Sequence, residues 1–326
     1  MNFSSPRSSY SQNIVSSMEM NLAKNPDLPA IITPERQETW SQMWGRTGRL
    51  AKGLAHLGLA KGDRVALFLP NGFEFSEAFI ATTRGGFVKT PVNFNFKAEE
   101  LAYQLNDCGA SALITHADLL PVVDAARPRV PGLRQVVVAG SDKAPAHTVD
   151  YEALIADTPD GELDVAISPD DIHMILYTSG TTGQPKGAVR GYSEDYHTGI
   201  TVCVEWQVRS GDVQLAVAPQ YHAGPCAWFL ATLVSGGTLS VQESFHPVHL
   251  LEAVTRDRVN WMMMVPIMFD RLMSMGAKTL GKFDLSSLRT MISGGAPLHT
   301  ATKLAIKACL PNVELNEFYG STELGV

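Results

Sequence analysis

The sequence predicts an α/β protein with two tandem, mostly parallel sheets flanked by helices. Short β-branched or aliphatic runs alternate with amphipathic helical stretches along the chain. That order of elements builds parallel sheets with helices on both faces. The length of 326 residues also exceeds what a single hydrophobic core usually holds, so we expect two subdomains.

The first part of the chain shows both kinds of pattern. Apolar residues between Met43 and Leu57 recur at helical spacing, and Gly58 follows them as a helix-ending residue. A second apolar helical face runs from Ala98 to Leu105. Aliphatic runs before and after this helix predict buried strands at Val65–Leu69, Ala112–Thr115 and Gln135–Val138.

A polar, acidic and proline-bearing stretch from Thr158 to Asp171 predicts a boundary. We therefore expect a first α/β subdomain over residues 1–168 and a second over residues 169–326. The strands expected in the second part are Ile172–Leu176, Val213–Ala218, Thr238–Val241, Asn260–Met264, Arg289–Ile292 and Val313–Phe318. The helices expected between these strands lie near residues 194–205, 225–235, 247–257, 266–275 and 298–309.

The composition bears on partners and compartment. A formal net charge of −7 and a pI of about 5.7 argue against a nucleic-acid partner, which favours a basic face. The cysteines are widely separated and form no CxxC pair, so we expect reduced thiols. The chain has no signal-peptide pattern and no run of roughly 18 apolar residues, the length needed to cross a bilayer. These features predict a cytoplasmic protein without a membrane segment, and they leave an oligomer possible.

A loop rich in glycine and hydroxyl groups follows the expected strand Ile172–Leu176. Glycines let consecutive backbone N–H groups converge on an anion, hydroxyls add rotatable donors, and a lysine adds a charge suited to phosphate. This inventory fits a polyphosphate better than a neutral ligand. The candidate phosphate ligands are Thr178, Ser179, Gly180, Thr181, Thr182, Gly183 and Lys186.

Two other interpretations of this loop are less consistent with its residues. Glycine, serine, threonine and proline also occur in ordinary solvent loops, but such a loop needs neither the lysine nor a strand that leads directly into it. A Walker A loop requires G-x-x-x-x-G-K-[ST]. Pro185 stands five residues after Gly180, and Gly187 follows Lys186, so the Walker A motif is excluded.

The segment Tyr177–Gly187 is similar to the signature of the adenylate-forming superfamily, which contains acyl-CoA synthetases, luciferases and peptide-synthetase adenylation domains. Every constrained position of that signature matches. The segments Thr39–Ser41, Gly58–Val65 and Leu69–Asn71 resemble the opening part of the family. The resemblance implies ATP-dependent activation of a carboxylic acid as an acyl-adenylate, followed by thioester formation with coenzyme A. It gives Lys186 a catalytic role.

The resemblance also assigns roles to a histidine and to a glycine-rich turn. His222, in the segment Pro219–Gly224, matches the residue at the carboxylate-binding end of the acyl pocket. Taken alone, a histidine after a strand is more often a structural hydrogen-bonding residue. The turn after the expected strand Arg289–Ile292 matches one wall of the adenine pocket, although it could also be a plain helix start. Its residues are Gly294, Gly295, Ala296 and Pro297.

A third motif, Tyr319-Gly320-Ser321-Thr322-Glu323, follows the last expected strand. Strand ends in open α/β sheets are where ligands collect. By resemblance, Tyr319 stacks on adenine, Thr322 bonds a phosphate oxygen, and Glu323 coordinates Mg²⁺. An aromatic face, a hydroxyl donor and a hard oxygen ligand suit those tasks. The resemblance thus makes Lys186, His222, Thr322 and Glu323 the candidate catalytic residues.

The substrate pocket is predicted from apolar residues near His222. Its candidates are His222, Gly224, Trp228, Met263, Met264 and Gly294. Such a lining favours a medium-to-long fatty acid or an aromatic acid over acetate. An amino acid would need a buried carboxylate for its ammonium group, and we expect none unless Asp195, Glu205 or Asp270 folds close.

The family's proteins continue beyond the position that corresponds to Val326. The resemblance implies that the end of the N-terminal domain and a mobile C-terminal domain with a catalytic lysine lie in that continuation. We therefore expect residues 1–326 alone to be a poor catalyst, with ATP, Mg²⁺ and coenzyme A as the cofactors of the complete enzyme. The alternatives are a non-catalytic nucleotide- or acyl-binding module, an adenylation domain that loads a carrier protein and, more remotely, a phosphotransferase.

Overall fold

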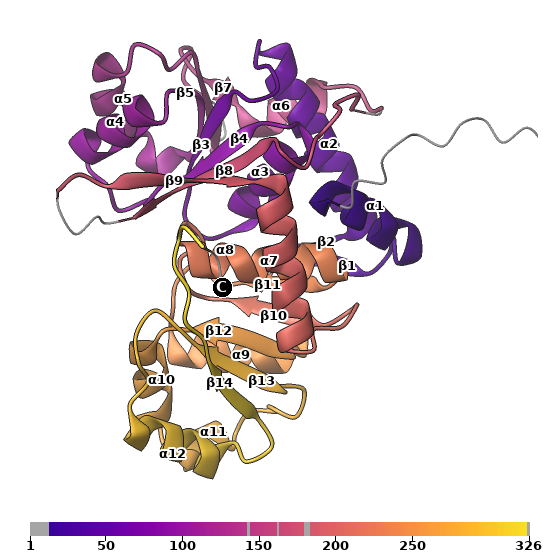
Figure 1. Ribbon diagram of the computed structural model, residues 1–326, viewed down its shortest axis with the longest axis vertical. Coiled ribbons are helices and arrows are strands. Elements are labelled where there is room, and N and C mark those ends of the chain that lie inside the picture. Colours follow the sequence, from indigo (N-terminus) through magenta and orange to yellow (C-terminus); the bar gives the residue numbers. More distant parts are fainter. Residues whose placement is uncertain (1–12, 142–143, 162, 179–182, 325–326) are drawn as a thin grey trace, which may run out of the picture.

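The structure is a computed structural model that describes residues 13–141, 144–161, 163–178 and 183–324. It contains two seven-stranded sheets with helices packed against their faces. Figure 1 shows the two layered units one above the other, with α8 and the final segment of the chain between them. The predicted fold class is confirmed.

The first sheet is built mainly from the N-terminal half of the chain. Its strands are β3 (Arg64–Phe68), β4 (Val88–Pro91), β5 (Ala110–His116), β6 (Gln135–Ala139), β7 (Val149–Asp150), β8 (Ile172–Thr178) and β9 (Lys186–Gly191). They lie in the order β7-β6-β5-β3-β4-β8-β9. Neighbouring strands are parallel, except for the antiparallel hairpin β8–β9.

Helices cover both faces of this sheet because its strands are apolar on both sides. Val65 and Leu67 pack with the first helical layer, whereas Ala66 and Phe68 pack with the second. The first layer holds α2 (Trp40–His56), α3 (Phe73–Arg84) and α6 (Tyr151–Asp157). The second layer holds α4 (Ala98–Asp107) and α5 (Leu120–Ala126), with short 3₁₀ turns at Ala117–Leu119 and Arg127–Arg129.

The second sheet has the order β14-β13-β12-β10-β11-β1-β2 and is parallel apart from the pair β1–β2. Its strands are β1 (Pro29–Ile32), β2 (Gln37–Thr39), β10 (Val213–Ala216), β11 (Thr238–Val241), β12 (Trp261–Met264), β13 (Thr290–Ser293) and β14 (Glu314–Glu317). Its helices are α1 (Ile14–Lys24), α7 (Tyr192–Glu205), α8 (Ala223–Ser235), α9 (Pro247–Asp257), α10 (Pro266–Met273), α11 (Ala277–Leu280) and α12 (Thr300–Cys309).

Every strand predicted from the sequence occurs, and the ends of these strands shift by two residues at most. The predicted boundary after residue 168, however, does not separate the two sheets. Strands β1 and β2 join the second sheet, where Ile31 aligns with Leu239, and strands β8 and β9 join the first, where Met174 aligns with Lys89. Because each half of the chain lends strands to the other sheet, one apolar core joins both.

The two sheets are also joined by a buried asparagine, which fixes the loop that carries His222. Asn71 follows β3 of the first sheet. Its side-chain amide donates to the carbonyl oxygens of Ala218 (3.0 Å) and Gln242 (3.3 Å), beyond the ends of β10 and β11. Its side-chain oxygen accepts from the N–H of Gln220 at 2.8 Å. A single side chain thereby holds the start of the Pro219–His222 loop.

No helix among the described residues has both the length and the apolar character needed to span a membrane.

Candidate functional site

A cavity of about 850 Å³ lies where the second sheet meets the first. Its walls follow the carboxyl ends of β10, β12, β13 and β14 and include side chains from β8 and β9. Carboxyl ends of parallel strands are the usual ligand-binding edge of an α/β sheet. The structure brings these sequence-predicted residues to the cavity: His222, Gly224, Met263, Gly295, Ala296, Pro297, Tyr319, Gly320, Ser321 and Thr322.

The glycine-rich turn after β13 forms one wall of the cavity. A side chain at Gly294 would place its Cβ 1.9 Å from the ring of Phe318, so only glycine fits there. Gly295 has a φ of +83°, a backbone conformation that favours glycine. Beyond the turn, Glu317 accepts a hydrogen bond from the N–H of Leu298 at 2.9 Å. The turn is thus fixed closely against the segment that follows β14.

We predict that Gly294→Ala destabilises the protein by about 1–3 kcal/mol, because the new methyl group overpacks the Phe318 ring. Thermal or urea unfolding measures the loss. Gly132→Ala is the matched control, since its Cβ would meet nothing within 4 Å. Equal stability of the two variants would contradict this close packing of Gly294 against Phe318.

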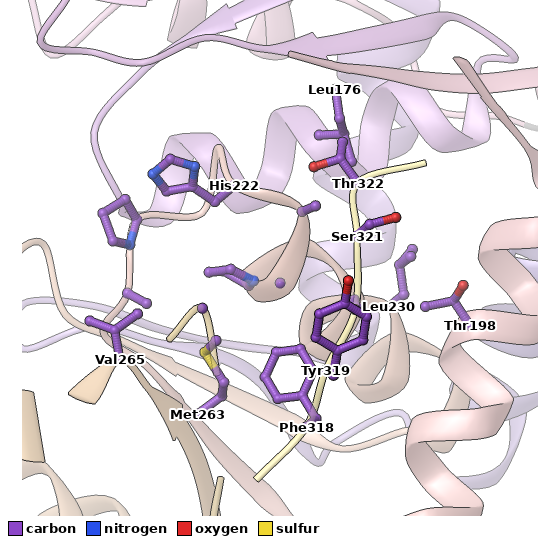
Figure 2. A pocket seen from close by; sticks show the side chains of 18 of the residues that line it. Leu176, Thr198, His222, Leu230, Met263, Val265, Phe318, Tyr319, Ser321 and Thr322 are labelled. Carbon is purple, nitrogen blue, oxygen red and sulfur yellow. The ribbon is translucent and has the colours of Figure 1, made fainter. Parts of the chain in front are cut away.

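The Phe318–Thr322 segment runs through the middle of the cavity (Figure 2). In that view Thr198 and Leu230 lie on one side of the segment, and His222 and Val265 lie on the other. Tyr319 is 95% exposed, so its ring is accessible for stacking. Glu323, at the end of the same motif, is exposed and does not line the cavity.

His222 stands at the start of α8, at the N-cap position. Its ring lies 4.2 Å from that of Tyr221, and surrounding protein atoms remove enough water to lower the pKa of His222 below its ordinary value. The side chain itself remains exposed at the edge of the cavity. A neutral imidazole at neutral pH can donate one hydrogen bond and accept another.

The predicted phosphate loop is the turn of the β8–β9 hairpin. Thr178 and Lys186 face each other at its base, and Gly183 has a φ of +141°. The hairpin base is tethered to α4, because the Tyr103 hydroxyl donates to the carbonyl of Pro185 at 2.9 Å. Ser179, Gly180, Thr181 and Thr182 lie outside the described residues. Thr178, Gly183 and Lys186 do not line the 850 Å³ cavity, and the Lys186 side chain is exposed.

Three residues that were predicted to contact the substrate do not line the cavity. They are Trp228, Met264 and Gly294. Trp228 is fully buried among aromatic rings, with Trp206 at 4.7 Å and Phe318 at 5.1 Å between ring centroids. Met264 packs in the core on the opposite face of β12 from Met263, because strand side chains alternate. Gly294 lies behind Phe318. The structure thus gives these three residues packing roles beside the cavity, and their contact with a substrate stays a prediction.

A polar wall of the cavity was predicted only in part, since Asp195 alone of its residues was named from the sequence. It consists of Arg190 on β9 with Asp195 and Thr198 on α7, and all three side chains are buried. The Arg190 guanidinium donates to Asp195 at 2.5 Å, to the Thr198 hydroxyl at 2.8 Å and to the carbonyl oxygen of Thr322 at 3.4 Å. It therefore links the edge of the first sheet to the motif after β14. Asp195 and Thr198 are three apart on a helix, a spacing that could have indicated a shared face.

Two buried residues of the neighbouring strands β8 and β4, His173 and Lys89, extend the hydrogen-bond network of this polar wall. His173 Nδ1 lies 2.7 Å from Asp195, and His173 Nε2 lies 2.6 Å from Lys89 Nζ. Burial, helped by the charge of Lys89, lowers the pKa of His173 to about 4. The imidazole is then neutral, with Nδ1 donating to Asp195 and Nε2 accepting from Lys89. Burial likewise lowers the pKa of Lys89 to about 7.

Stability is expected to rise with pH above neutrality because of Lys89. Its folded-state pKa of about 7 lies below the ordinary 10.5, so between these values the unfolded chain binds a proton that the native state lacks. The free energy of unfolding should rise by about 1.4 kcal/mol per pH unit in that window. Urea unfolding at pH 7.5 and 9 measures this slope. Lys89→Met should remove it, whereas the exposed Lys278→Met should keep it. A pH-independent wild type would contradict the assignment.

The described residues contain no group of three or more His, Cys, Asp or Glu side chains that could hold a metal ion. Magnesium differs from most metals here, since it is often held by one or two carboxylates together with substrate phosphates. Glu323 supplies one exposed carboxylate. One carboxylate can help to bind a Mg²⁺ ion that a phosphate ligand also coordinates, but it cannot hold a permanently bound metal by itself.

Comparisons with known proteins identify the family of the chain. A family model described as AMP-binding enzyme matches residues 18–326. The chain belongs to the AMP-binding enzyme family. It is 33% identical over 290 residues to a feruloyl-CoA synthase from an Amycolatopsis species, covering 87% of this chain and 54% of that protein. It is 30% identical over 318 residues to 4-coumarate--CoA ligase 1 of Petroselinum crispum, covering 94% and 56%.

Among solved structures, the chain is similar to the inhibitor-bound N-terminal domain of FACL13 from Mycobacterium tuberculosis. The TM-score is 0.87 at 29% identity, over 96% of this chain and 76% of that one. The chain thus has the fold of an N-terminal domain in this family. It spans about half the length of the curated relatives that it matches.

Proposed function

We propose that the protein that contains this chain activates a carboxylic acid with ATP as an acyl-adenylate and then forms a coenzyme A thioester. One observation carries the proposal. Three separate sequence motifs, at His222, Gly295–Pro297 and Tyr319–Thr322, meet in one cavity at the ligand-binding edge of a parallel sheet. Membership in the AMP-binding enzyme family and the names of its CoA-ligase relatives support the same reaction.

The proposed roles follow from where each group lies. Tyr319 and the Gly295–Pro297 wall bind adenine, and Thr322 bonds a phosphate oxygen. The hairpin loop with Lys186 binds the β- and γ-phosphates, and Glu323 binds Mg²⁺ carried by ATP. The ion and the lysine offset negative charge while the acid's carboxylate attacks the α-phosphate. His222, at the cavity edge, orients that carboxylate.

The proposed acid is aromatic or a medium-to-long fatty acid. Much of the cavity lining is apolar, with Met174, Leu176, Leu230 and Met263 among its residues. Acetate could not use this surface. The named substrates of the CoA ligases from Amycolatopsis and Petroselinum crispum favour an aromatic acid.

An amino acid is a poor fit, although Asp195 does fold close to the cavity. Its carboxylate already accepts hydrogen bonds from Arg190 at 2.5 Å and His173 at 2.7 Å. The positive charge of Arg190 offsets the charge that an ammonium group would need. Asp270, by contrast, does not line the cavity, and it accepts a hydrogen bond from Thr302 on α12.

Acid-dependent release of AMP and pyrophosphate tests the proposal. The assay uses the natural polypeptide that contains residues 1–326 and a panel of acetate, fatty acids, cinnamates and amino acids. Tight ATP binding without turnover would favour a non-catalytic nucleotide-binding module, and release of ADP would favour a phosphotransferase. Thioester transfer to a carrier protein in place of coenzyme A would point to an adenylation domain.

A further inference from the structure

We infer that Arg190 is a specificity-determining residue that binds an oxygen atom on the tail of the acid. The acid would then carry a hydroxyl, carbonyl or second carboxylate group away from the carboxylate that reacts. The inference rests on the proposed function, because it concerns the acyl part of the same cavity. Nothing in the signature motifs of the chain assigns a role to this residue.

The guanidinium has donors left for a ligand. Arginine carries five N–H groups. One N–H from each nitrogen of Arg190 is used, by Asp195, by Thr198 and by the Thr322 carbonyl. Among the described residues no other acceptor takes the remaining two N–H groups. Arg190 is only 5% exposed, so donors without a partner there are unfavourable. A ligand oxygen would satisfy them.

The surroundings of Arg190 make a bound acceptor selective. The neighbouring lining includes Met174, Leu176 and Leu230, which offer no hydrogen bonds. A cavity with one polar patch in an apolar wall discriminates strongly between ligands that do and do not fill the patch, because the polar group is otherwise left unpaired. The apolar part binds the carbon skeleton, and Arg190 selects its oxygen substituent.

The charge of the cluster determines the kind of substituent. Asp195 is paired with both Arg190 and His173, and His173 is neutral. Lys89 contributes between zero and one positive charge near neutral pH. The cluster therefore has a net charge between zero and plus one. It favours a neutral or anionic acceptor and disfavours an ammonium group.

The position of the cluster suits the tail of the acid. Thr198, which accepts from Arg190, lies with Leu230 on the opposite side of the Phe318–Thr322 segment from His222 (Figure 2). The proposed function puts the reacting carboxylate at His222. The part of the cavity next to Thr198 is then left for the tail.

The test compares three non-hydrolysable acyl-sulfamoyl adenosines, with cinnamoyl, 4-hydroxycinnamoyl and 4-carboxycinnamoyl groups. Their affinities for the natural polypeptide that contains residues 1–326 are measured by titration calorimetry. Wild type should bind an oxygen-bearing probe about tenfold or more tightly than the plain probe. Arg190→Met should reduce that ratio to near one. Arg271→Met, which removes an exposed arginine outside the cavity, should leave the ratio unchanged.

The outcomes separate the inference from the proposed function. Equal binding of all three probes by wild type overturns the inference but leaves adenylate binding intact. An equal loss of affinity for every probe in Arg190→Met also overturns it, since Arg190 would then serve the adenylate itself or the fold. If no probe binds, the proposed function fails as well. Arg190→Met/Asp195→Asn gives a second variant without an unpaired buried charge, should the single variant not fold.

Discussion

Lys186→Ala is expected to slow acyl-adenylate formation by about 10²–10³-fold. Enzymes commonly lose that much rate when one group that stabilises charge in the transition state is removed. Lys186 opens β9 directly after the loop, opposite Thr178. Its ammonium group is the charge in this segment that can reach a polyphosphate. Because its side chain is exposed and lines no core, the substitution should not alter folding.

The measurement is acid-dependent formation of AMP in the natural polypeptide that contains residues 1–326, together with its melting temperature. Lys282→Ala, at another exposed lysine, serves as the matched control and should behave as wild type. Normal AMP formation in Lys186→Ala would remove this residue from the phosphate site. A lowered melting temperature in that variant alone would indicate a structural role.

The sequence predicted the fold class and the parallel order of the sheets because apolar periodicity reports burial. It did not predict β4, and Lys89 explains why. A strand that contains a lysine and a proline within Val88–Pro91 gives no apolar run, yet Lys89 is fully buried. Its burial depends on His173, which contacts Lys89 and in turn pairs with Asp195, and both come from a distant part of the chain.

The exchange of strands between the sheets also could not be predicted. The acidic stretch before Asp171 has the composition of a linker, but a boundary in composition need not be a boundary between sheets. No local signal in the sequence links strand β1 to its partner, since Ile31 aligns with Leu239 in a distant part of the chain. Pairing of such distant segments depends on packing rather than on local propensity.

The parts of the cavity wall that could be predicted from the sequence are those formed by a motif just after a strand. The residues of the Gly295–Pro297 and Tyr319–Thr322 segments line the cavity, because each directly follows a strand end. Side-chain direction was the weaker inference. Met263 and Met264 look equivalent in the sequence, and only the alternation of β12 sends the first to the cavity and the second to the core.

Asp195→Ala is expected to give the largest loss of stability, about 3–5 kcal/mol, because it leaves a buried arginine without its counter-charge. Arg190 is 5% exposed, and Asp195 is its carboxylate partner among the described residues. His173 would lose the acceptor of its Nδ1 proton in the same step. Urea unfolding of purified residues 1–326 measures the change.

Two comparisons decide whether this loss comes from an uncompensated charge. Asp284→Ala removes the carboxylate of an exposed ion pair with Arg258 and should cost far less stability, because solvent screens that pair. Arg190→Met/Asp195→Asn removes both buried charges together and should therefore be more stable than Asp195→Ala, despite carrying one substitution more. Equal losses in the single and double variants would mean that packing around α7, rather than the pairing of Arg190 with Asp195, determines the stability of this wall.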